Sequence, residues 1–130
     1  MENDMIDRKK LKDAVICKES DSILEVSRIL RDTRMRHLIV VDSALKPLGV
    51  ISTVDINNRV VSQQKNPETV TATDIMTHPL ASAEVSSTYD AAYKLMIEKE
   101  TYSLPVTEQG KLIGILDFNF LFSQLGGKKQ

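Results

Sequence analysis

The chain has 130 residues, of which 42% are hydrophobic and 27% are charged, and its formal net charge is -1. That length favours one compact domain, or two half-domains that share a core. The near balance of charge excludes a global attraction to nucleic acid or anionic lipid, and the single cysteine, Cys17, excludes an intramolecular disulfide framework.

The N-terminal residues and the few side chains that could bind a metal exclude further classes of protein. Residues 1–12 are charged rather than apolar, which excludes a secretory signal there, and no apolar run is long enough to span a bilayer. His37 and His78 lie far apart and form no recognisable metal motif with Cys17. We therefore expect a cytoplasmic protein that binds no metal, no nucleic acid and no membrane.

The first half of the chain predicts a strand, a helix, two further strands and a second helix. Ile23, Val26, Ile29 and Leu30 recur at spacings of three and four, as on one face of a helix. Ser22 and Glu25 give that helix a capping-box start. The predicted segments are a strand at residues 14–17, the helix from residue 23, strands at 38–41 and 48–51, and a helix at 53–62.

The second half repeats this order. Residues 66 apart match up to the turn between the two later strands, as Leu38 and Leu104 do, and residues 65 apart match after it. Ser87 and Asp90 give the repeated helix its own capping pattern. The matching segments are a strand at residues 80–83, a helix after Ser87, strands at 104–107 and 112–116, and a helix at 118–125.

These segments divide the chain into two copies of one unit. The first repeat with its lead-in covers residues 1–63, a linker covers 64–73, the second repeat covers 74–125, and a tail covers 126–130. One unit of this size cannot bury both faces of its sheet alone. The sequence therefore predicts an α/β (α+β) fold of two pseudo-symmetric β-α-β-β-α repeats packed sheet to sheet.

Several runs resemble a known family. Residues 36–42 (RHLIVVD) and 48–55 (LGVISTVD) resemble a cystathionine-β-synthase (CBS) repeat, and so do residues 74–77 (DIMT) and 104–115. The resemblance covers about residues 12–125. It is specific because the same motifs occur twice in the same order. It implies a tandem CBS pair, or Bateman module, whose clefts hold adenosyl ligands such as AMP, ADP, ATP or S-adenosylmethionine.

The first candidate site lies where Ser52, Thr53 and Asp55 follow a predicted strand and open a helix. The free N–H groups of a first helical turn favour an anion, and the two hydroxyls add donors. Asp55 offers two acceptor oxygens that match the vicinal hydroxyls of ribose, the part this motif plays in the family. The same residues also form a variant capping box that needs no ligand, and the two interpretations are not exclusive.

The remaining candidates depend on the resemblance. Family members carry phosphate-contacting side chains at the positions of Arg36 and His37. The family places adenine near the first strand, which implicates Val15 and Ile16, with Ile51 across from them. For these three apolar residues, an ordinary core position is the alternative.

The second repeat departs from the pattern. Asp117 stands at the position of Ser52, and Phe120 stands at that of Asp55. A carboxylate there repels phosphate, and the ribose acceptor is missing. Asp117 is expected to cap its helix and Phe120 to pack. We therefore expect a second cleft that is weak or empty, and one ligand per chain.

Three other arginines have simpler explanations. Arg28 and Arg31 are expected on a solvated helix face, and Arg34 near a helix C-terminus, where a cation is favourable without a ligand.

The functional prediction is a regulatory module, not an enzyme, that senses an adenosine-containing ligand through its first repeat. The resemblance also implies a homodimer, and the output would pass to a separate partner protein. The alternative is a ligand-free dimerisation or adaptor module. A catalytic triad of His37, Ser52 and Asp55 is not expected, because the serine lacks a Gly-x-Ser-x-Gly elbow.

Overall fold

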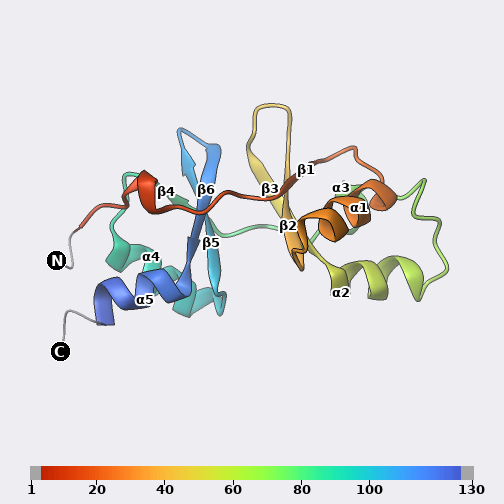
Figure 1. The fold of residues 1–130 in the computed structure, drawn as a ribbon. Coiled ribbons are helices and arrows are strands. Elements are labelled where there is room, and N and C mark those ends of the chain that lie inside the picture. Colours follow the sequence, from red (N-terminus) through yellow and green to blue (C-terminus); the bar gives the residue numbers. More distant parts are fainter. Residues whose placement is uncertain (1–3, 127–130) are drawn as a thin grey trace. The chain divides into compact units, whose positions relative to one another are not determined.

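The computed structural model describes residues 4–126 and divides the chain into two compact units (Figure 1). The first unit consists of residues 15–80, and the second of residues 4–14 together with 81–126. Each unit combines helices with a three-stranded sheet, which confirms the predicted α+β class. Every helix within residues 4–126 falls short of the length and apolarity that a bilayer crossing requires.

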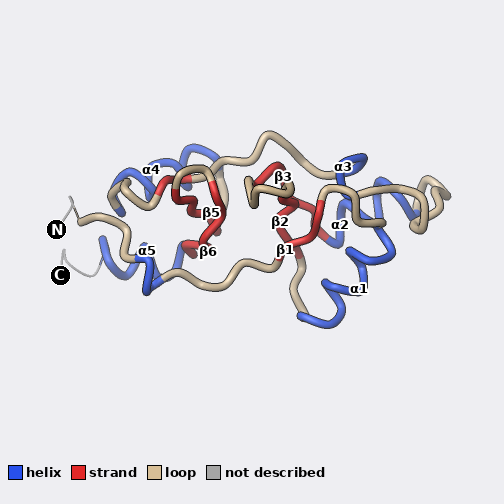
Figure 2. Tube along the Cα trace, turned by 90° about the horizontal axis from the view of Figure 1, so that it is seen from above, coloured by secondary structure: helices blue, strands red, loops and turns tan. Residues whose placement is uncertain are grey.

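The sheet of the first unit has the order β1-β2-β3, with β1 parallel to β2 and β3 antiparallel to it. The helices lie to one side of this sheet (Figure 2). The elements are β1 (Ile16–Lys18), α1 (Ile23–Thr33), β2 (His37–Val41), β3 (Pro47–Ser52), α2 (Thr53–Ile56), its π-helical continuation η2 (Asn57–Val61) and α3 (Ala72–Ile75).

The second unit repeats this topology with the order β4-β5-β6. Its elements are the short 3-10 helix η1 (Arg8–Lys10), β4 (Ala83–Glu84), α4 (Tyr89–Lys99), β5 (Ser103–Glu108), β6 (Lys111–Asp117) and α5 (Phe118–Gly126). The repeated order of elements predicted from the sequence is thus confirmed.

The N-cap of α1 is the residue predicted from the sequence, whereas that of α4 is not. The Ser22 side chain accepts a hydrogen bond from the Glu25 N–H at 3.1 Å, so the predicted cap of α1 is confirmed. The predicted cap of α4 at Ser87 is wrong by one residue, because the side chain of Thr88 accepts from the Ala91 N–H at 3.1 Å. Ser87 instead donates its backbone N–H to the Glu84 carbonyl within the preceding turn.

The end of the predicted linker carries a helix that the sequence interpretation missed. Thr71 and Asp74 form a reciprocal capping box at the start of α3, in which the Asp74 carboxylate accepts the Thr71 N–H at 3.0 Å. The buried side chains of Ala72 and Ile75 attach this short helix to the first unit.

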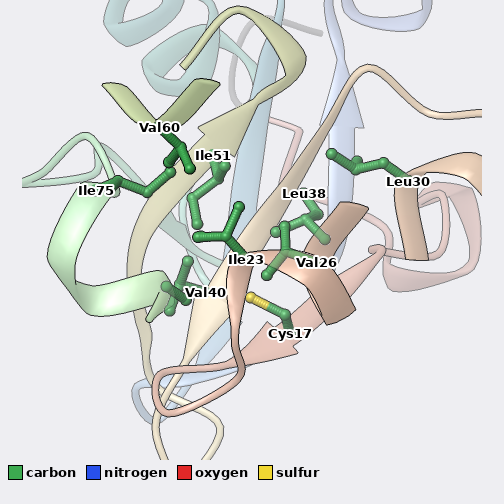
Figure 3. Packing of buried hydrophobic residues seen from close by; sticks show 10 residues of the cluster. Cys17, Ile23, Val26, Leu30, Leu38, Val40, Ile51, Val60 and Ile75 are labelled. Carbon is green, nitrogen blue, oxygen red and sulfur yellow. The ribbon is translucent and has the colours of Figure 1, made fainter. Parts of the chain in front are cut away.

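The core of the first unit lies between α1 and the sheet (Figure 3). Ile23 and Val26 of α1 meet Leu38, Val40 and Ile51 of the strands, and each is less than 2% exposed. Full burial of such a side chain contributes about 1.5–3 kcal/mol. The predicted helix face and strand positions therefore supply the core.

Each sheet gains a short extra pairing from a segment that precedes a repeat. In the first unit, Thr77 and Val50 of β3 exchange two backbone hydrogen bonds, at 2.8 and 3.0 Å. In the second unit, Lys12 and Ile115 of β6 do the same, at 2.9 and 2.8 Å. We call residues 4–12 and 70–77 the lead-in segments. Because residues 4–12 pack with β6, the compact units do not coincide with the repeat boundaries at 63 and 74.

Candidate functional site

The turn from β3 into α2 holds the Ser52–Asp55 pair in a reciprocal capping box. The Ser52 Oγ accepts from the Asp55 N–H at 3.1 Å, and Asp55 Oδ2 accepts from the Ser52 N–H at 2.9 Å. The capping interpretation is therefore confirmed. It fixes the Asp55 carboxylate at the end of β3, with 16% of its side-chain surface still exposed.

The capping box leaves the Asp55 carboxylate able to accept further hydrogen bonds. A carboxylate offers about four lone-pair positions, and the Ser52 N–H occupies one of them. The Arg59 guanidinium lies 3.7 Å from Asp55 Oδ1, and its other terminal nitrogen donates to the Ile75 carbonyl at 2.6 Å. Arg59 is thus tied to α3 while it faces the carboxylate. The sequence interpretation missed this residue, although its spacing of four from Asp55 is the spacing of a helical ion pair.

The start of α2 offers fewer free N–H groups than predicted. The Thr53 N–H donates to the Arg36 carbonyl at 2.9 Å, and the Asp55 N–H is bound to Ser52. Among residues 4–126, the Val54 N–H is the amide of this first turn that donates to no acceptor. An anion here would depend on that amide, the exposed Thr53 hydroxyl and nearby cations.

The two candidate phosphate-contacting residues, Arg36 and His37, lie beside this turn. The Arg36–Thr53 backbone hydrogen bond brings Arg36 to the start of α2, and its side chain is exposed. His37 is paired with Ser52 across the β2–β3 ladder and is half-buried. Arg36 makes no ion pair within the described part of the chain. The structure therefore gathers Arg36, His37, Ser52, Thr53 and Asp55 in one place.

The three apolar candidates differ in what they expose. Ile51 is fully buried in the core, so the core interpretation holds for it. Val15 is half-buried, packs against the same core and accepts the Ile39 N–H at 2.9 Å. Ile16 is 38% exposed and lies opposite Ile39 on β2. Ile16 is the candidate with substantial surface available to a ligand.

The equivalent turn in the second unit is occupied by the chain itself. Asp117 Oδ1 accepts the Phe120 N–H at 2.9 Å, and the Asp117 carboxylate also pairs with Lys12. The Lys12 hydrogen bond, followed by that of Phe120, lowers the pKa of Asp117 from its usual 3.8. The Phe120 ring packs edge-on against Tyr89, with centroids 5.9 Å apart. The predicted capping role of Asp117 and packing role of Phe120 are confirmed.

No cluster of three or more His, Cys, Asp or Glu side chains suited to a metal occurs among residues 4–126. Cys17 is 3% exposed, and burial, with a smaller contribution from Asp21, raises the pKa of its thiol to about 12. It is therefore a protonated core residue.

Comparisons with known proteins support this architecture. An uncharacterized protein of Methanopyrus kandleri is 33% identical over 106 residues, which are 81% of this chain and 54% of that protein. The CBS domain-containing protein CBSCBSPB1 of Arabidopsis thaliana is 28% identical over 113 residues, 86% of this chain and 21% of that protein. The chain thus spans about half the length of the first relative and a fifth of the second.

Solved structures show the same fold at lower identity. OpuCA of Staphylococcus aureus superposes with a TM-score of 0.77 at 17% identity, covering 92% of this chain and 98% of that one. The model of the CBS domain family matches twice, at residues 9–62 and 72–118. Together these two matches cover most of the chain. The chain therefore belongs to the CBS domain family and carries two CBS repeats in tandem.

Proposed function

We propose that this chain is a regulatory module that binds an adenosine-containing ligand, an adenine nucleotide or S-adenosylmethionine, in the cleft of its first repeat. The observation that carries the proposal is the position of the Asp55 carboxylate. It is half-buried at the end of β3, held there by its own cap, and has one oxygen free of backbone hydrogen bonds.

A ribose diol suits this carboxylate. Two vicinal hydroxyls donate to two acceptor positions, and charge-assisted hydrogen bonds contribute about 1.5–3 kcal/mol each. The Arg59 guanidinium lies beside the same carboxylate, 3.7 Å from Asp55 Oδ1. The Thr53 hydroxyl and the Arg36 side chain are exposed beside the same turn and suit the phosphate of a nucleotide.

The proposed module has no catalytic step. It acts as a homodimer on a separate partner protein, and ligand binding changes its output only so far as the ligand prefers one arrangement of the protein. The adaptor alternative also has a supporting observation: the capping box satisfies Ser52 and Asp55 without any ligand.

A titration with a matched control distinguishes the ligand sensor from the ligand-free adaptor. The chain offers two capping boxes in one unit, Ser52–Asp55 and Thr71–Asp74. Asp55→Ala and Asp74→Ala each remove a box, but only Asp55 belongs to the proposed site. By isothermal titration with AMP, ADP, ATP and S-adenosylmethionine, we expect Asp55→Ala to weaken the best ligand by about tenfold or more. Asp74→Ala should retain it.

A second pair of variants tests the role of the carboxylate. Asp55→Asn keeps one oxygen for the Ser52 N–H but replaces the other by an amide donor, so binding should fall although the cap persists. Phe120→Ala, in the second repeat, should leave the affinity and a stoichiometry of one unchanged. If the wild-type protein binds no member of the panel at millimolar concentration, the adaptor function replaces the sensor.

A further inference from the structure

The guanidinium of Arg59, in η2, lies between a carbonyl group and a carboxylate of the first unit. One terminal nitrogen donates to the Ile75 carbonyl at 2.6 Å, and the other lies 3.7 Å from Asp55 Oδ1. A charge-assisted hydrogen bond from a guanidinium to a carboxylate is about 2.7–2.9 Å long. The contact with Ile75 is therefore a hydrogen bond, whereas the nitrogen that faces Asp55 lies beyond hydrogen-bond distance.

The carbonyl group that holds Arg59 is itself fixed. Ile75 is 3% exposed and ends the short helix α3. At the start of α3, the Ala72 N–H donates to the Asp21 carbonyl at 2.9 Å, and the Thr73 hydroxyl donates to the Glu19 carbonyl at 2.8 Å. Because a guanidinium is planar and rigid, the hydrogen bond to Ile75 also orients the nitrogen that faces Asp55.

The carboxylate opposite this nitrogen is fixed as well. Asp55 Oδ2 accepts the Ser52 N–H at 2.9 Å, and no group of residues 4–126 donates a hydrogen bond to Oδ1. A hydroxyl oxygen about 2.7 Å from Oδ1 can also lie about 2.9 Å from the Arg59 nitrogen. A hydroxyl group donates one hydrogen bond and accepts others. The separation of 3.7 Å therefore suits a hydroxyl that donates to Asp55 and accepts from Arg59.

The second repeat lacks both members of this pair. Phe120 stands at the position of Asp55, and Gln124 stands 65 residues after Arg59. The Phe120 ring packs against Tyr89 and offers no acceptor. The carboxylate and the guanidinium are thus present together in the repeat with the proposed ligand site and absent together in the other.

We propose that Arg59 is a specificity-determining residue of the ligand site, where it donates a hydrogen bond to one hydroxyl of the ribose diol. The inference rests on the proposed adenosine site and adds the residue that distinguishes ribose from deoxyribose there. One hydroxyl donates to Asp55 Oδ1 and accepts from Arg59, and the other donates to Oδ2. A ligand without the first hydroxyl leaves the guanidinium and Oδ1 without that partner.

Isothermal titration of the full chain with AMP, 2′-deoxy-AMP and 3′-deoxy-AMP tests this contact. The wild-type chain should bind each deoxy ligand about tenfold or more weakly than AMP, because each has lost one hydrogen bond to a charged group. Arg59→Gln introduces the residue of the second repeat, which is shorter and uncharged. It should weaken AMP and reduce the discrimination against one deoxy ligand by about fivefold or more. Discrimination against the other deoxy ligand should persist.

This pattern separates a ligand contact from a purely structural role. A residue that only held α3 in place would weaken all three ligands alike when it is replaced. Two unchanged ratios in Arg59→Gln therefore overturn the inference, even where Asp55→Ala abolishes binding and the proposed function stands. A wild-type chain that does not bind AMP, or that binds the three ligands equally, also overturns it. The ligand panel described above then decides separately whether the sensor function survives.

Two further variants complete the test. Lys94→Gln is the matched control, because Lys94 follows Asp90 by the same four residues and pairs with it at 3.2 Å on α4. It should leave all three affinities unchanged. Arg59→Lys keeps the charge but offers one nitrogen in place of two, so it cannot serve Ile75 and a hydroxyl in the same way. It should lose the same discrimination as Arg59→Gln, and full retention in a folded Arg59→Lys chain contradicts the proposal.

Discussion

Gly49 of β3 provides a sharp test of how the lead-in segment at residues 70–77 is held. A Cβ atom at this position would lie 2.7 Å from the Thr77 carbonyl oxygen and 2.8 Å from the Met76 sulfur. The glycine thus allows the backbone of Thr77 to approach β3 closely.

The expected cost of Gly49→Ala follows from these contacts. To restore an ordinary contact of 3.4 Å from 2.7 Å, the Thr77 carbonyl must retreat by about 0.7 Å. That oxygen accepts the Val50 N–H at 3.0 Å, and the Thr77 N–H donates back at 2.8 Å. If the strained contact is kept, overpacking of this kind costs about 1–3 kcal/mol. If the carbonyl retreats instead, the two lost backbone hydrogen bonds cost a similar amount in place of the strain. We therefore expect the free energy of unfolding to fall by about 1–3 kcal/mol.

Urea denaturation measures this fall, and hydrogen exchange locates it. The amides of Val50 and Thr77 should lose protection in Gly49→Ala. Gly110→Ala is the control: its added methyl meets no atom within 4 Å, and its φ of +83° alone accounts for a cost of about 1 kcal/mol. Unchanged protection at Val50, with a loss of stability below about 0.5 kcal/mol, would refute the reasoning.

Three other predictions follow from the caps and the titrating groups. Thr88→Ala should cost about 1 kcal/mol in urea denaturation, while Ser87→Ala should stay within about 0.5 kcal/mol, because Thr88 caps α4. Because the pKa of Asp117 is lower in the folded state than its usual 3.8, the ionised carboxylate stabilises the folded state above pH 3.8. This stabilisation is lost as the pH falls through the pKa of the folded state. The stability difference between wild type and Asp117→Asn should therefore shrink on acidification; a constant difference would contradict this. The raised pKa of Cys17 favours the folded state below pH 9.0, a benefit lost as pH rises towards about 12. Alkylation of Cys17 at pH 9 should accordingly be slow in the native protein and fast in urea.

The sequence could predict the elements of the fold because its periodicity is strong and occurs twice. The spacing of Ile23, Val26, Ile29 and Leu30 predicted α1, and apolar runs such as residues 38–41 predicted the hairpin strands. The Thr88 cap was missed because Ser87 and Thr88 offer the same chemistry to neighbouring amides. The short helix α3 was missed because four residues carry too little periodicity to be distinguished from a linker.

The candidate site was predictable in part. Arg36, His37, Ser52, Thr53 and Asp55 lie together because β2 and β3 pair in the register expected of a hairpin. Which first-turn amides are free could not be predicted, because the Thr53 N–H is bound by a carbonyl 17 positions earlier in the chain.

The pairing of Lys12 with β6 affects how the protein matures during synthesis. Arg8 and Glu108, which form an ion pair in the same unit, are 100 residues apart. Residues 4–12 leave the ribosome about 100 residues before their partners in β6 and its turn are made. The first unit, contiguous at residues 15–80, can fold while translation continues. The second must wait with its earliest segment unpaired, so a stalled or truncated chain would expose that segment to chaperones and proteases.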